Sequence, residues 1–151
     1  MRLKKLNKLR HQLPLPPTLI EMIESGQWVH PGDDVMLAKI PFIRDPLVFL
    51  GSKDNMLFES GPLMGPDEIE NEMFSEYRGS EVGERSLPWI DVERTLFVIC
   101  NKWPGDDVGI ALDYRTDNSP RVVGGDWTNG NRCIYREISS SFDAFVELLG
   151  L

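Results

Sequence analysis

Residues 95–138 contain four short segments of strand-like sequence that are separated by turn residues. The four segments are "TLFVIC" (95–100), "VGIALDY" (108–114), "RVVGG" (121–125) and "NRCIYREI" (131–138). The first is a continuous apolar run, as in strands covered on both faces, and the second alternates between large and small side chains. Asn129-Gly130 before the last segment is a strong hairpin signal. Together these features predict a meander of adjacent antiparallel strands.

Helix signals precede and follow this meander. Thr18 and Glu21 have capping-box spacing ahead of Gly26, a typical helix terminator. A second helix is predicted between Pro66 and Gly79. The C-terminal segment has Ser140 and Asp143 in capping-box spacing, and its apolar residues follow a helical period. Those residues are Phe142, Phe145, Val146 and Leu149.

One further strand, "PLVFL" (46–50), is a continuous apolar run and is predicted to be covered on both faces. Helices outside a block of strands predict a single α+β domain, with a central, mostly antiparallel sheet and helices packed against it. The chain of 151 residues is about one domain long. We expect residues 1–12 to be a basic leader or frayed helix and residues 13–151 to be the domain.

The region 101–127 holds five aspartates, which raises the question of a metal or acid–base site. Most of them lie beside turn residues, where aspartate bonds to its own backbone, so a structural role is expected. The alternative is a carboxylate cleft formed where the two "PGDD" turns, 31–34 and 104–107, meet. The chain has only two histidines, and it lacks an EF-hand, a Walker loop and a G-x-S-x-G elbow. We therefore expect no metal, no cofactor and no enzymatic activity.

The net charge of −8 argues against nucleic acid or an anionic membrane as the main partner. No apolar run has the length of a signal peptide or a membrane span, and Cys100 and Cys133 are expected to be reduced core residues. These features indicate a cytoplasmic protein. We expect it to be a monomer or a weak dimer.

Segment 67–85 carries five net negative charges. Within it, Glu68, Glu72 and Glu76 recur every four residues and would form one stripe on the predicted helix, with Asp67 and Glu70 nearby. Such a stripe favours a basic protein partner, although it is equally typical of a solvated helix face.

All four tryptophans flank proline or glycine turns, at positions 28, 89, 103 and 127. Tryptophans in such places usually cover the end of a core, and the alternative is that they line a groove for a peptide or sugar. We regard Trp103 and Trp127 as further candidates for partner binding.

The order of these segments resembles the SUKH superfamily, which contains fungal cell-wall synthesis regulators and many bacterial immunity proteins. The matching features are a Gly-Asp turn entering a strand, a strand with apolar valines, and a final amphipathic helix introduced by Ser-Phe. They correspond to Gly105-Asp106, Val122-Val123, Ser141-Phe142 and the apolar residues Phe145, Leu148 and Leu149. The resemblance is best over residues 95–149.

The resemblance implies a single α+β domain that binds protein without catalysis. Bacterial members are typically antidotes that bind nuclease or deaminase toxin domains, so a basic toxin domain is the expected partner. Two alternatives stay open: a small-ligand-binding or hydrolytic domain with a carboxylate cleft, and an adaptor similar to the cell-wall synthesis regulators.

Overall fold

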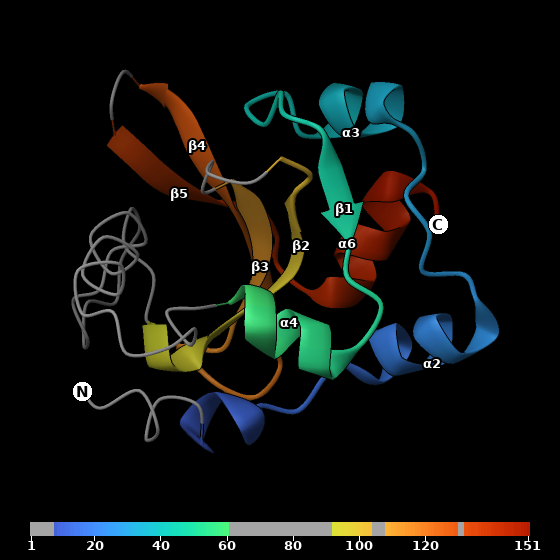
Figure 1. Cartoon of the computed structure of the whole chain (residues 1–151), viewed down its shortest axis with the longest axis vertical. Coiled ribbons are helices and arrows are strands. Elements are labelled where there is room, and N and C mark those ends of the chain that lie inside the picture. Colours follow the sequence, from blue (N-terminus) through green and yellow to red (C-terminus); the bar gives the residue numbers. More distant parts are fainter. Residues whose placement is uncertain (1–7, 61–91, 104–107, 130–131) are drawn as a thin grey trace.

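The structure is a computed structural model that describes residues 8–60, 92–103, 108–129 and 132–151. Its centre is a five-stranded sheet in the order β1-β2-β3-β4-β5, and every pair of neighbours is antiparallel. The strands are β1 (Leu47–Phe49), β2 (Thr95–Asn101), β3 (Gly109–Asp113), β4 (Arg121–Asn129) and β5 (Arg132–Ser139). The predicted α+β class and the antiparallel meander are therefore confirmed (Figure 1).

The helices in the described part of the chain are short. They are a helical turn over residues 8–11, α2 (Pro17–Ser25), α3 (Asp33–Lys39), α4 (Lys53–Glu59), the 3-10 turn η1 (Val92–Arg94) and α6 (Phe142–Leu149). Figure 1 shows α2, α3 and α6 on the same side of the sheet. Among these described helices, none is long and apolar enough to cross a membrane.

Both faces of the central strands are buried. On the face that packs with the helices, Leu96, Ile110 and Leu112 share one core with Phe145 and other apolar residues. On the opposite face a second, smaller cluster contains Phe97, Ala111, Val123 and Tyr135. A register shift between Phe97 and Ile99 places an extra residue in β2, so Val98 and Ile99 both belong to the first core.

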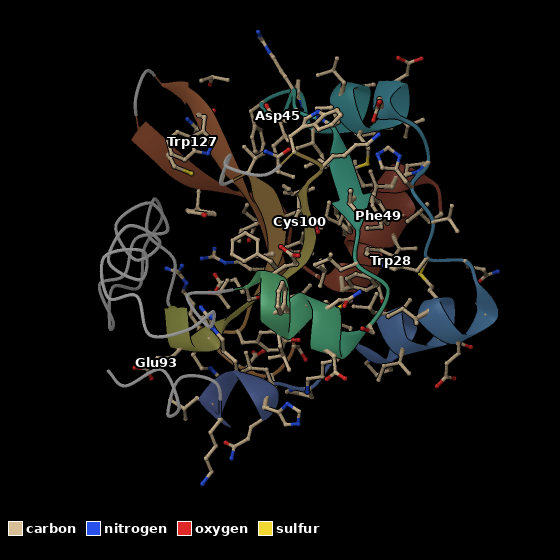
Figure 2. The ribbon with its side chains drawn as sticks, viewed as in Figure 1. Trp28, Asp45, Phe49, Glu93, Cys100 and Trp127 are labelled. Atoms are coloured by element: carbon tan, nitrogen blue, oxygen red, sulfur yellow. The ribbon has the colours of Figure 1, made fainter. Side chains whose placement is uncertain are left out.

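Trp28 joins the edge of the sheet to the C-terminal helix. Its indole N–H donates to the Leu50 carbonyl at 2.9 Å, and its ring lies 4.5 Å from the Phe49 ring and 5.7 Å from the Phe142 ring, centroid to centroid. Figure 2 shows Trp28 and Phe49 together beside α6. The prediction that a tryptophan covers the end of the core is confirmed for Trp28, because this side chain is buried with its only polar atom satisfied.

Two predicted helix caps are wrong by one or two residues. Helix α2 begins after Pro16, with Pro17 in its first turn, and the Thr18 hydroxyl instead donates to the Asp143 carboxylate at 2.5 Å. Helix α6 is capped by Ser141, not Ser140, because the Ser141 hydroxyl accepts from the Ala144 N–H. The predicted end of α2 is confirmed, since Gly26 is left-handed with φ of 78°.

The sequence predicted a turn at the first "PGDD" segment, and this prediction is wrong for its two aspartates. Asp33 and Asp34 form the first turn of α3, which follows Gly32 at φ of 115°. The prediction of two covered faces is also wrong for the first strand. β1 is an edge strand of three residues, and Val48 in its middle is 39% exposed.

Part of the predicted basic leader packs against α4. Residues 8–11 are helical, and Arg10 is almost fully buried, with its guanidinium donating to the Ser60 carbonyl at 2.9 Å. The Lys53 ammonium donates to the carbonyls of His11 and Leu13, and partial burial lowers the pKa of Lys53. The first seven residues lie outside the described part, and the division after residue 12 stays a prediction.

Candidate functional site

The acidic stripe predicted to bind a partner lies outside the described residues. The stripe residues Glu68, Glu72 and Glu76 fall within 61–91, as do the nearby Asp67 and Glu70 and the second predicted helix. Asp106 and Asp107 of the second "PGDD" segment also lie outside the described residues. Whether the two segments meet therefore stays a prediction.

Trp103 is the most exposed tryptophan in the described part, at 57%. It follows β2, where its backbone N–H donates to the Asn101 side-chain carbonyl at 3.2 Å. The Lys102 ammonium lies 5.5 Å from the Trp103 ring centroid, a cation–π distance. Trp103 therefore presents its ring to solvent with one cation beside it, and does not close the core as Trp28 does.

Trp127 lies near the end of β4 and is partly buried (Figure 2). Because β2 and β4 run in the same direction on either side of β3, Trp103 and Trp127 lie at the same end of the sheet. The two predicted tryptophans thus share an end of the sheet, although they differ in exposure.

Asp113 in β3 is buried between two arginines. Its carboxylate accepts from the Arg115 Nε and from the Arg121 Nε, and the closest approach in each ion pair is 2.8 Å. The side chains of Asp113 and Arg115 are essentially inaccessible, at 0% and 1% exposure, whereas that of Arg121 is 28% exposed. Arg121 also approaches Glu137 at 3.5 Å. A buried carboxylate with two such partners forms a structural ion pair, and its predicted place inside a strand is confirmed.

Asp126 is the second buried carboxylate of the sheet. It lies within β4 and accepts hydrogen bonds from the Thr128 hydroxyl and the Thr128 N–H, and from the Arg136 guanidinium of β5. Burial alone raises the pKa of Asp126, but the hydrogen bonds from Thr128 and Arg136 outweigh it, so the net shift of this pKa is downward. The carboxylate is therefore held in its charged form by fixed donors.

Asp117 completes the described aspartates of this region. Its carboxylate accepts from the Ser119 N–H at 2.7 Å, the bond of an aspartate turn. Arg94 of η1 reaches the same loop through the Asn118 side chain at 3.0 Å. Within the described ranges, no three His, Cys, Asp or Glu side chains are grouped so that they could hold a metal ion.

A small pocket lies between α3 and the segment before β1. Its volume is about 110 Å³, and its lining includes Asp33 and Asp34 of the first "PGDD" segment together with Asp45. Figure 2 shows Asp45 in the loop beside α3. The acidic "PGDD" motif at 31–34 was the only feature of the sequence that pointed to this pocket. Another part of the lining comes from residues 43–47, which the tertiary structure brings next to α3.

His30 also lines this pocket, and both of its ring nitrogens have neighbours. Its Nδ1 accepts from the Gly32 N–H at 2.9 Å, so the ring hydrogen of a neutral His30 is on Nε2. Nε2 lies 3.4 Å from the Asp33 carboxylate, and the ring packs on Phe49 at 5.3 Å between centroids. His30 thus supports the turn into α3, with no free nitrogen aimed at a substrate.

Comparison with family models, with curated proteins and with solved structures found no match for this chain.

Proposed function

We propose that this protein is a non-catalytic protein-binding module, most consistent with a cytoplasmic immunity protein of the SUKH type that neutralises a basic toxin domain. The observation that carries the proposal is the distribution of charge. Segment 67–85 holds five of the eight net negative charges of the chain. An acidic segment of this kind is expected to raise the association rate with a basic partner and to compete with nucleic-acid phosphates for it.

The ion pairs of the sheet support this proposal indirectly. Asp113 and Asp126, the two buried carboxylates of the strands, are neutralised by arginines. The excess negative charge of the chain is therefore carried by the other acidic residues. A partner can reach those of them that are exposed. The exposed ring of Trp103 adds an apolar contact of the type that is enriched at protein interfaces.

The alternative of a small-ligand or hydrolytic cleft has less support. Sites for metabolite-sized ligands usually enclose about 300–1,000 Å³. The acidic pocket beside α3 encloses about 110 Å³, and its histidine is engaged with Gly32 and Asp33. The adaptor hypothesis predicts protein binding as well, and differs from ours only in the partner.

A charge-reversal experiment tests the proposal. The chain is co-expressed with the toxin domain that the proposal expects to be encoded beside its gene, and growth and affinity are compared between wild type and the triple variant Glu68→Lys, Glu72→Lys and Glu76→Lys. We expect the variant to bind at least about tenfold more weakly, because rim charges and desolvated charge pairs both lose their attraction. The affinity of the wild type should also fall as salt is added.

The matched control reverses three exposed acids elsewhere, Glu21, Glu24 and Glu147, with the same total change in charge. We expect this control to retain most of the affinity. Equal affinity of the wild type and the stripe variant at every salt concentration would contradict the proposed role of the stripe. Absence of any binding or growth rescue by the wild type would contradict the immunity function itself.

A further inference from the structure

The pocket beside α3 combines an apolar floor with an acidic rim. Met36, Ile43 and Leu47 form the floor, and each of them is no more than 6% exposed. Leu37, also in the lining, is 47% exposed. At about 110 Å³ the pocket holds the volume of three to four waters, at roughly 30 Å³ per water, which suits the end of one side chain.

The rim has more negative than positive groups. Three carboxylates, those of Asp33, Asp34 and Asp45, line the pocket together with a single guanidinium, that of Arg44. Asp33 is 77% exposed and, among the described residues, forms an ion pair only with His30. Within the part of the chain that the structure describes, the carboxylates of Asp34 and Asp45 form no ion pair or side-chain hydrogen bond. The rim therefore favours a cation, and the carboxylate oxygens of Asp34 and Asp45 can accept hydrogen bonds from it.

We propose that this pocket binds an arginine side chain of a basic protein partner. The inference rests on the proposed protein-binding function and names one contact within it. The aliphatic stem of an arginine can lie on the apolar floor while its guanidinium reaches the rim. Arginine fits better than lysine because its five N–H donors can serve several carboxylates at once. The pocket is too small for a metabolite, and its rim would repel an anion.

Trp103 lies close to the pocket and can add a second contact with the same partner. Pro46 lines the pocket, and its carbonyl accepts from the Lys102 N–H at 2.9 Å. Trp103, 57% exposed, is the next residue in the chain. A partner that places an arginine in the pocket therefore comes close to the tryptophan ring. Tryptophan and arginine are both enriched among the residues that dominate binding energy.

The test is an NMR titration of the full chain with N-acetyl-arginine amide. We expect amide shifts at Leu37 and Asp45 that saturate in the millimolar range, the scale expected for one side chain. The neutral isostere N-acetyl-citrulline amide should bind about fivefold more weakly or not at all. The double variant Asp34→Asn and Asp45→Asn should weaken arginine-amide binding about fivefold, as two exposed ion pairs are lost.

The control variant Glu21→Gln and Glu24→Gln removes the same charge from exposed positions of α2 and should bind like the wild type. Equal binding of the arginine and citrulline probes, or equal binding of the wild type and the Asp34/Asp45 variant, would overturn the pocket proposal. This titration needs no partner, so its failure is separate from the failure of the toxin experiment, which tests the function.

Discussion

The carboxylates of the sheet and those of the pocket beside α3 have the same chemistry and opposite surroundings. Asp113 and Asp126 are at most 2% exposed, and each is bonded to an arginine. The pocket carboxylates lie on the surface, and Asp34 and Asp45 have no ion-pair partner among the described residues. Burying a charge is costly unless the charge is paired, so the sheet aspartates are tied to the fold. The pocket aspartates are available for binding.

This difference shows why a cluster of aspartates in a sequence does not identify a site. In "NKWPGDDVGIALDYRTDNSPRVVGGDW" the aspartates are neighbours in sequence, yet the described ones have three separate tasks. Asp113 neutralises Arg115, Asp117 closes a turn, and Asp126 holds Thr128 and Arg136. The expected structural role is supported for Asp117 and Asp126, although Asp126 lies inside β4 and not in the hairpin turn where it was predicted.

The largest effect should come from removing the most buried carboxylate. Asp113→Ala leaves the Arg115 guanidinium buried, with its side chain 1% exposed and without this partner. Breaking a buried pair by removing one member typically costs about 3–5 kcal/mol. We expect a loss of that size in the free energy of unfolding, measured by urea titration. A loss below about 1 kcal/mol would mean that the sheet and pocket carboxylates differ less than their burial indicates.

Asp126→Asn tests the second sheet carboxylate and adds a dependence on pH. The variant keeps an acceptor for Thr128 and loses the charge that attracts Arg136, so we expect a cost of about 1–2 kcal/mol at pH 7. The pKa of Asp126 is lowered in the folded protein, so its stabilisation is fully present above the unfolded pKa of about 3.9. The stabilisation is lost as the pH falls from there through the folded pKa.

The measurement is the difference in unfolding free energy between wild type and Asp126→Asn from about pH 7 to pH 2. The difference should be constant at neutral pH and should shrink below about pH 4. A difference that grows on acidification has the wrong sign for a carboxylate with a lowered pKa, and would exclude this role for Asp126.

Most of the sheet could be predicted because strand periodicity and hairpin signals are local. All five strands were located to within a few residues, although β4 continues to Asn129, beyond the predicted end at 125. Helices α3 and α4 were missed because each has only seven residues, too few for a helical period to show.

The chemistry of the site was harder to predict than the fold. Asp113 was placed correctly inside a strand, but its partner Arg121 lies on the next strand, and their contact depends on the β3–β4 register. The pocket depends on the packing of α3 beside residues 43–47, which no sequence spacing encodes. The exposure of Trp103 is likewise a tertiary property, since its turn context resembles that of the buried Trp28.

A smaller effect is expected for Arg121→Gln. Arg121 is the outer member of the Asp113 pair, with a side chain 28% exposed, and Asp113 keeps its bond to Arg115 when Arg121 is replaced. Glutamine can still donate one hydrogen bond, and water can reach this side of the pair. We expect a cost of about 1 kcal/mol in urea unfolding, well below that of Asp113→Ala. A cost as large as that of Asp113→Ala would place Arg121, and not Arg115, as the main partner of Asp113.

The smallest effect on stability should come from the pocket. Asp34→Asn with Asp45→Asn removes two charges that have no ion-pair partner among the described residues, so unfolding free energy should change by no more than about 0.5 kcal/mol. The variant can be more stable than the wild type, because like charges around one pocket repel each other. Added salt should then reduce this gain in unfolding free energy. Urea unfolding at low and high salt measures both. A loss above about 2 kcal/mol would show that these carboxylates support the fold as Asp113 does, and that binding is not their main use.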